Sequence, residues 1–123
     1  MANILVVDDS PAVTALLRAV LEGAGHTVLE ANDGAGGLAV LSTTAVDLVV
    51  LDMMMPGMDG VETVRRLRGG GNRVPVIAMS GGTDAFPAAY SLKMSEMYGA
   101  DRLLYKPFEN DELLEAVDQL LAR

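Results

Sequence analysis

The stretch that decides the fold is VDLVVLDMMMPG, residues 46–57. A run of aliphatic and β-branched residues ends in a single carboxylate, Asp52, and a Pro-Gly turn follows a few residues later. A strand that is buried on both faces reads as a continuous apolar run, so this stretch predicts a central strand of a parallel sheet. Asp52 is then expected at the carboxyl end of that strand, where open α/β sheets place their ligands.

A second apolar run, ILVV at residues 4–7, ends in two adjacent carboxylates, Asp8 and Asp9. Three more short apolar segments follow, at residues 27–31, 74–79 and 102–105, and helical segments lie between the strands. Alternating strands and helices predict parallel strands joined by helical crossovers. We therefore expect one α/β domain over residues 1–123, a doubly wound (βα)5 three-layer sandwich around a five-stranded parallel sheet.

The helical segments carry start signals and apolar stripes. Ser10 followed by proline predicts the start of the first helix, and Asp59 predicts the cap of the third. The 3.6-residue spacing in the first helix predicts five buried side chains: Val13, Leu16, Leu17, Val20 and Leu21. In the third helix, three side chains are expected to be mostly solvated: Arg65, Arg66 and Arg68. A fourth helix is expected over roughly residues 84–98.

Composition restricts the classes of function. The 123 residues are 50% hydrophobic and 21% charged, which is typical of one globular domain. The chain has no cysteine, which excludes disulfide and thiolate chemistry. Its formal net charge of −8 argues against direct nucleic-acid binding, which needs clustered lysine and arginine. No apolar run approaches the roughly 18 residues of a membrane span, so we expect a cytoplasmic protein without a membrane partner.

Five polar residues are expected to share one rim of the sheet, because each follows or ends a predicted strand. They are Asp8, Asp9, Asp52, Ser80 and Lys106. Two unit charges about 4 Å apart repel by about 4 kcal/mol at an effective dielectric of 20, so three gathered carboxylates favour a bound cation. Carboxylate oxygens suit Mg²⁺, with Mn²⁺ as an alternative ion.

Such a rim can also accept a phosphoryl group. Asp52, ionised at neutral pH without the help of a general base, can attack phosphorus and form an aspartyl phosphate. An ammonium group such as Lys106 and a hydroxyl such as Ser80 can then neutralise or hydrogen-bond the phosphoryl oxygens.

These motifs resemble the receiver domain of two-component response regulators over nearly the whole chain. The resemblance is carried by Asp8-Asp9, by Asp52 followed by Met-Pro-Gly-Met-Asp-Gly, by Ser80 and by Lys106-Pro107-Phe108. It implies the flavodoxin-like strand order 2-1-3-4-5. It also implies a phosphoacceptor switch that takes its phosphoryl group on Asp52 from a histidine kinase or a histidine phosphotransfer protein.

The resemblance further assigns roles at the rim. Asp9 and Asp52 are expected to hold Mg²⁺ directly, Asp8 through water, and the backbone carbonyl of Met54 is expected as a further ligand. Lys106 is expected to pair with the phosphoryl group. Ser80 is expected to move toward the phosphoryl group, which switches the face made by the fourth helix, fifth strand and fifth helix for a downstream protein effector.

Three features depart from the family pattern. Leu103 stands where receivers often carry an aromatic ring that reorients with the hydroxyl residue, although Tyr105 shares its face of the strand by parity. The segment between Ser80 and Lys106 is several residues longer than is common, which suggests an enlarged mobile loop over the site. Two positions after Asp52 and after Ser80 stand Met54 and Gly82, and neither offers a polar side chain to orient an attacking water.

Other classes of protein need different residues at the same positions. A phosphatase of the haloacid-dehalogenase type needs a second aspartate two positions after the nucleophile, where Met54 stands. A flavodoxin-like flavin binder needs a Ser, Thr and Gly-rich phosphate loop in place of Asp8-Asp9-Ser10-Pro11. A degenerate receiver that only binds a partner is not supported by the five rim residues.

Within the receiver family, the sequence leaves the place in signalling open. A stand-alone regulator without an output domain is expected from the Met1 start and the Leu-Ala-Arg end. The alternatives are a phosphorelay intermediate or sink without its own effector, and a receiver that is part of a longer protein. The expected assembly is a monomer or a phosphorylation-dependent dimer.

Overall fold

The computed structural model describes residues 1–55, 57–80 and 99–122, and within them the chain forms one parallel sheet. The order is β2-β1-β3-β4-β5, as the family resemblance implies. The strands are β1 (Asn3–Val7), β2 (Thr27–Ala31), β3 (Leu48–Asp52), β4 (Val76–Ser80) and β5 (Arg102–Tyr105). The helices are α1 (Pro11–Gly23), α2 (Gly34–Thr43), α3 (Gly60–Gly69) and α5 (Asn110–Leu121). The fourth helix and the enlarged loop expected from the sequence lie outside the described residues.

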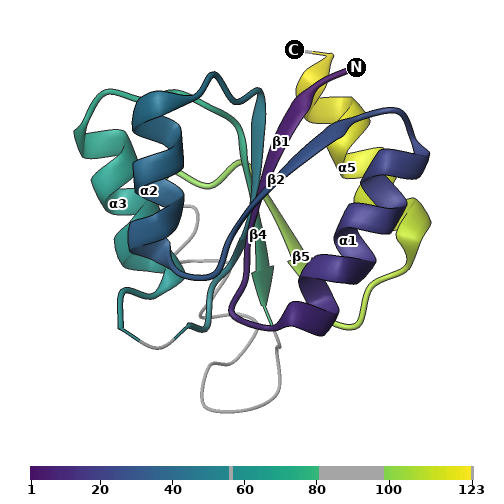
Figure 1. Cartoon of the computed structure of the whole chain (residues 1–123), viewed down its shortest axis with the longest axis horizontal. Coiled ribbons are helices and arrows are strands. Elements are labelled where there is room, and N and C mark those ends of the chain that lie inside the picture. The colour runs from purple at the N-terminus through teal and green to yellow at the C-terminus, as the bar shows by residue number, and fades with distance from the viewer. Residues whose placement is uncertain (56, 81–98, 123) are drawn as a thin grey trace.

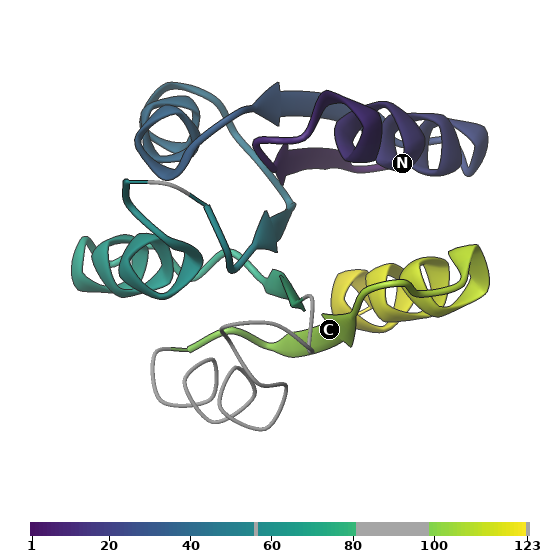
Figure 2. The same cartoon turned by 90° about the horizontal axis from the view of Figure 1, so that it is seen from below.

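The helices cover both faces of the sheet and complete the predicted three layers. Helices α1 and α5 lie on one face, and α2 and α3 lie on the other (Figures 1 and 2). The alternation along β1 shows the division: Ile4 and Val6 pack in the core under α1 and α5, whereas Leu5 and Val7 pack in the core under α2 and α3. Because β1, β3 and β4 are buried on both faces, their sequences read as unbroken apolar runs.

The expected helix caps are present. The Ser10 hydroxyl accepts a hydrogen bond from the Val13 amide at 3.4 Å, and Pro11 is the first residue of α1. The Asp59 carboxylate accepts from the Glu62 amide at 2.9 Å at the start of α3. These caps satisfy amides that have no partner within their own helix, so they fix where the chain turns from the sheet edge into each helix. None of the helices in the described residues is long and apolar enough to cross a membrane.

The expected burial of Leu16 is wrong. Its side chain is 58% exposed, and the buried line of α1 runs through Thr14, Leu17 and Leu21. Thr14 is buried, and its hydroxyl donates to the Ser10 carbonyl at 2.7 Å, which satisfies its polar atom within the helix. Leu16 lies at the margin of this buried face.

The expected solvation of Arg68 is also wrong. Its guanidinium donates to the carbonyls of Gly99 at 2.7 Å and Val74 at 2.7 Å, and it pairs with Asp101 at 3.1 Å. Asp101 also accepts from the Val76 amide at 2.8 Å. Arg68 therefore ties the end of α3 to the segments that lead into β4 and β5, at the amino edge of the sheet.

Replacing Leu21 by alanine is expected to lower the free energy of unfolding by about 2–5 kcal/mol, because the side chain is fully buried and its loss leaves a cavity. The matched change Leu16→Ala in the same helix is expected to cost less than about 1 kcal/mol, because that side chain is mostly exposed. Urea unfolding followed by circular dichroism measures both, and equal costs would contradict the described orientation of α1.

Candidate phosphoryl-acceptor and metal site

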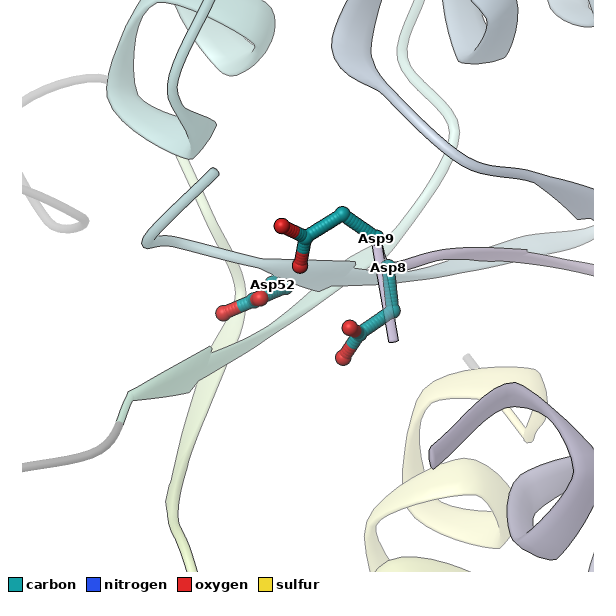
Figure 3. A group of neighbouring side chains, drawn as sticks. All are labelled: Asp8, Asp9 and Asp52. Atoms are coloured by element: carbon teal, nitrogen blue, oxygen red, sulfur yellow. The ribbon is translucent and has the colours of Figure 1, made fainter. Parts of the chain in front are cut away.

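The carboxyl edge of the sheet brings the predicted acids together. Strands β1 and β3 pair in parallel with Val7 opposite Leu51, so the residues that follow, Asp8 and Asp52, emerge at the same level. Both residues are almost fully buried, at 2% and 4% exposed. Asp9 is exposed, and one carboxylate oxygen from each of the three acids lies within 4.8 Å of the others. Figure 3 shows these carboxyl groups clustered at the ends of the two neighbouring strands.

Lys106 is the cation of this cluster. It follows β5, and its ammonium nitrogen lies 3.2 Å from Asp8 Oδ2 and 3.6 Å from Asp52 Oδ1. Its backbone amide donates to the Ser80 carbonyl at 2.6 Å, which holds the end of β5 beside the end of β4. Among the residues that the structure describes, this one ammonium accompanies the three carboxylates, so that part of the cluster carries an excess of negative charge.

Backbone amides also stabilise the two buried acids. The Met54 amide donates to Asp52 Oδ1 at 3.1 Å, and the Ser10 amide donates to Asp8 Oδ1 at 2.9 Å. Each bond forms two residues after the carboxylate, where the chain turns away from its strand. The turns thereby hold the two carboxylates at the sheet edge.

The electrostatics at Asp52 are unfavourable for its ionised form. Burial raises the pKa of this carboxyl above its usual value, and the neighbouring charges of Asp8 and Asp9 raise it further. The Met54 amide and the Lys106 ammonium oppose the rise but do not cancel it. A bound cation would offset the same repulsion, so the donor set of carboxylate oxygens fits a hard divalent ion such as Mg²⁺.

A pocket of about 420 Å³ opens beside Asp8 and Asp9. Its wall is completed by residues from α1 and from the end of β2: Pro11, Thr14, Glu30, Ala31 and Asn32. The sequence reasoning did not assign Thr14, Glu30 or Asn32 to the site. Asn32 directly follows β2, so the strand-end rule that identified the acids could have found it.

The remaining predicted residues lie along β4 and β5. Ser80 ends β4 and is fully buried. On β5, Leu104 packs into the core under α1 and α5, whereas Leu103 is half-buried and Tyr105 is 42% exposed. Leu103 and Tyr105 therefore alternate with the core residue, as the parity of the strand predicts, and their role in switching stays a prediction.

Comparison with known proteins identifies the family. Residues 4–118 match the model of the response regulator receiver domain. The chain belongs to this family. It therefore takes part in two-component signalling, which implies a histidine kinase as partner, and it has the acidic pocket of Asp8, Asp9 and Asp52 that is typical of phosphoacceptor response regulators.

Individual relatives agree with this assignment. The response regulator MprA of Mycobacterium tuberculosis is 39% identical over 121 residues, and MtrA of Mycolicibacterium smegmatis, a DNA-binding response regulator, is 37% identical. Each match covers 98% of this chain and 51% of the relative, so the chain spans about half the length of these curated relatives.

Solved structures show the same fold along the full domain. The receiver domain of the Francisella response regulator 1452 superposes with a TM-score of 0.90 at 31% identity and covers 100% of this chain and 98% of its own. The response regulator TrrA of Thermotoga maritima, solved with Mg²⁺ and BeF, gives a TM-score of 0.86 at 33% identity and covers 98% of this chain and 100% of its own.

Replacing Asp52 by asparagine in metal-free protein is expected to raise the free energy of unfolding by on the order of 1 kcal/mol near pH 7. The folded protein holds the pKa of Asp52 above that of the unfolded chain, so the ionised side chain costs stability at neutral pH. As the pH falls through the raised pKa, the wild-type carboxyl is protonated first in the folded state, and the gain from the substitution shrinks. Urea unfolding at several pH values measures both effects.

The matched control is Asp118→Asn, which removes the same charge from an exposed position on α5. We expect it to change the free energy of unfolding by no more than about 0.5 kcal/mol at any of these pH values. An Asp52→Asn protein that is less stable than the wild type near pH 7 would show that the carboxylate cluster does not repel as described.

Proposed function

We propose that Asp52 accepts the phosphoryl group when this receiver domain is phosphorylated by its histidine kinase or by a histidine phosphotransfer protein. The observation that carries the proposal is the position of its buried carboxylate, which ends the central strand β3, 3.6 Å from the Lys106 ammonium and beside Asp8 and Asp9. Asp8 and Asp9 lie on the neighbouring strand end, where they can neutralise a metal ion rather than compete for phosphorus.

The same acids supply the metal site of the proposal. Asp8, Asp9 and Asp52 offer carboxylate oxygens, and the Met54 carbonyl is proposed as a further ligand. Mg²⁺, or Mn²⁺ in its place, would supply positive charge next to the transferred phosphoryl oxygens. The structure of TrrA with Mg²⁺ and BeF supports this assignment for a relative of the same fold.

The transfer needs no proton to be removed from the nucleophile. An Asp52 carboxylate oxygen forms a bond to phosphorus, the bond between phosphorus and the donor histidine nitrogen breaks, and the imidazole keeps the electron pair and takes a proton from solvent. The Lys106 ammonium and the Met54 amide stabilise the ionised carboxylate before transfer. Afterwards Lys106 is within reach of a phosphoryl oxygen, whose charge it can partly neutralise.

The signal is proposed to leave the site through Ser80. This residue is buried at the end of β4, and its carbonyl accepts from the Lys106 amide, so a movement of Ser80 toward a phosphoryl group also acts on the start of the segment after β5. Tyr105, exposed on β5, lies on the face that we propose binds a downstream protein effector, with Leu103 beside it in place of a ring. We propose in addition that the domain acts as a monomer or as a phosphorylation-dependent dimer.

Turnover as a phosphatase of the haloacid-dehalogenase type is not supported by the site. Met54, two residues after Asp52, is 42% exposed and offers a thioether, which cannot act as the general acid for a leaving group. The aspartyl phosphate is therefore expected to persist as a signal until water reaches it.

Incubation with Mg²⁺ and acetyl phosphate is expected to add the mass of one phosphoryl group to the intact protein. The gain should be absent without Mg²⁺ and absent in Asp52→Ala, and it should persist in Asp118→Ala, which removes an exposed acid of α5. Intact mass spectrometry is the suitable measurement, because the chain has no tryptophan for a fluorescence assay.

Loss of the Lys106 ammonium tests the proposed role of this cation at the site. Lys106→Ala is expected to slow the phosphorylation or weaken the response to beryllofluoride, seen as changes of the Ser80 amide signal by NMR. A wild-type protein that gains no mass and shows no change with beryllofluoride and Mg²⁺ would overturn the proposed function.

A further inference from the structure

The first residue of α3 lies against the backbone that carries the phosphoacceptor. A Cβ atom added to Gly60 would lie 2.5 Å from the Met53 Cα and 2.8 Å from the Asp52 carbonyl oxygen. Both are backbone atoms, which cannot rotate away as the end of a flexible side chain can. Gly60 does not have a positive φ angle, so its backbone conformation is open to any residue and only this close approach requires glycine.

Gly60 also takes part in a chain of hydrogen bonds that ends on the Asp52 carboxylate. The Gly60 amide donates to the Met53 carbonyl at 3.2 Å. In a trans peptide the C=O and the following N–H point in opposite directions, so this bond turns the Met54 amide away from α3. The Met54 amide donates to Asp52 Oδ1 at 3.1 Å.

The other side of the same turn is fixed to the sheet. The Met53 amide donates to the Met79 carbonyl of β4 at 2.9 Å, and the Met53 side chain is fully buried. Met53 is thus held by β4 through its amide and by the first turn of α3 through its carbonyl, and the N–H that follows this carbonyl, that of Met54, is directed at the carboxylate.

We propose that Gly60 is a positioning residue for the phosphorylation of Asp52. Its lack of a side chain lets the first amide of α3 reach the Met53 carbonyl, which sets the peptide that donates to the Asp52 carboxylate. The inference deepens the proposed function and depends on Asp52 being the phosphoacceptor. A displacement of about 1 Å at a reacting group can slow a reaction by about a hundredfold, so a Cβ in this contact is expected to slow the phosphorylation of Asp52.

The test compares Gly60→Ala with Gly69→Ala. Gly69 ends the same helix, and a Cβ there would meet nothing within 4 Å, so the pair differs in the contact with the site.

Two quantities are measured at saturating Mg²⁺: the rate of phosphorylation by acetyl phosphate, from intact mass, and the hydrogen exchange of individual amides, from NMR. We expect Gly60→Ala to slow phosphorylation by about tenfold or more and to speed exchange of the Met54 amide by a similar factor, while the amides of β1 exchange as in the wild type. Gly69→Ala is expected to match the wild type in both.

Three results of this comparison would overturn the inference. Phosphorylation of Gly60→Ala within about twofold of the wild-type rate would do so, as would a slower rate with unchanged exchange at Met54, because the effect would then not pass through that peptide. A Gly69→Ala protein as slow as Gly60→Ala would show a general effect of helix α3. If the wild type itself gains no phosphoryl group, the proposed function fails and the inference fails with it, which the intact mass of the wild type alone reveals.

If the Gly60→Ala protein does not fold, amide hydrogen exchange in the wild type tests the inference instead. The Gly60 and Met54 amides of the wild type are both expected to be protected from exchange, since each donates to a partner inside the protein. Protection at both positions supports the proposed chain of bonds. Exchange at the rate of an open loop at either position overturns it.

Discussion

Repulsion between carboxylates at the end of the sheet is the constraint on which the rest of this structure depends. Asp8, Asp9 and Asp52 approach within 4.8 Å, and Lys106 supplies a single positive charge to the cluster. Such an arrangement survives only if the remainder of the domain is stable enough to hold it. The two apolar cores on either face of the sheet meet that demand, since they bury β1, β3 and β4 almost completely.

The two edges of the sheet differ in how their charged side chains are paired. At the amino edge, Arg68 and Asp101 neutralise one another and satisfy carbonyls and an amide of the connecting segments. At the carboxyl edge, negative charge is in excess and the main-chain amides of Ser10 and Met54 are committed to carboxylates. The first edge stabilises the fold. At the second edge the carboxylates repel one another, and a bound cation or the transfer of a phosphoryl group can relieve this repulsion.

Much of this could be predicted from the sequence, because the deciding signals are local. Apolar runs that end in acids define both the strands and the edge at which Asp8 and Asp52 meet, and parallel pairing then follows from the alternation with helices. The errors concern tertiary contacts. Leu16 is exposed because the buried face of α1 runs through Thr14, Leu17 and Leu21. Arg68 is not solvated because its guanidinium donates to the carbonyl of Gly99, which is distant in the sequence. No periodicity in the sequence encodes either arrangement.

The methionines of the turn after β3 differ in their access to solvent, and this has a chemical consequence. Met53 and Met55 are buried, at 0% and 7% exposed, whereas Met54 is 42% exposed at the rim beside Asp52. Thioether oxidation follows exposure, so within this trio an oxidant in solution reaches Met54 first. The product, a polar and chiral sulfoxide, would stand directly next to the acidic pocket. Among these three methionines, oxidation of the purified protein would therefore begin at the rim of the carboxylate cluster and not in the core.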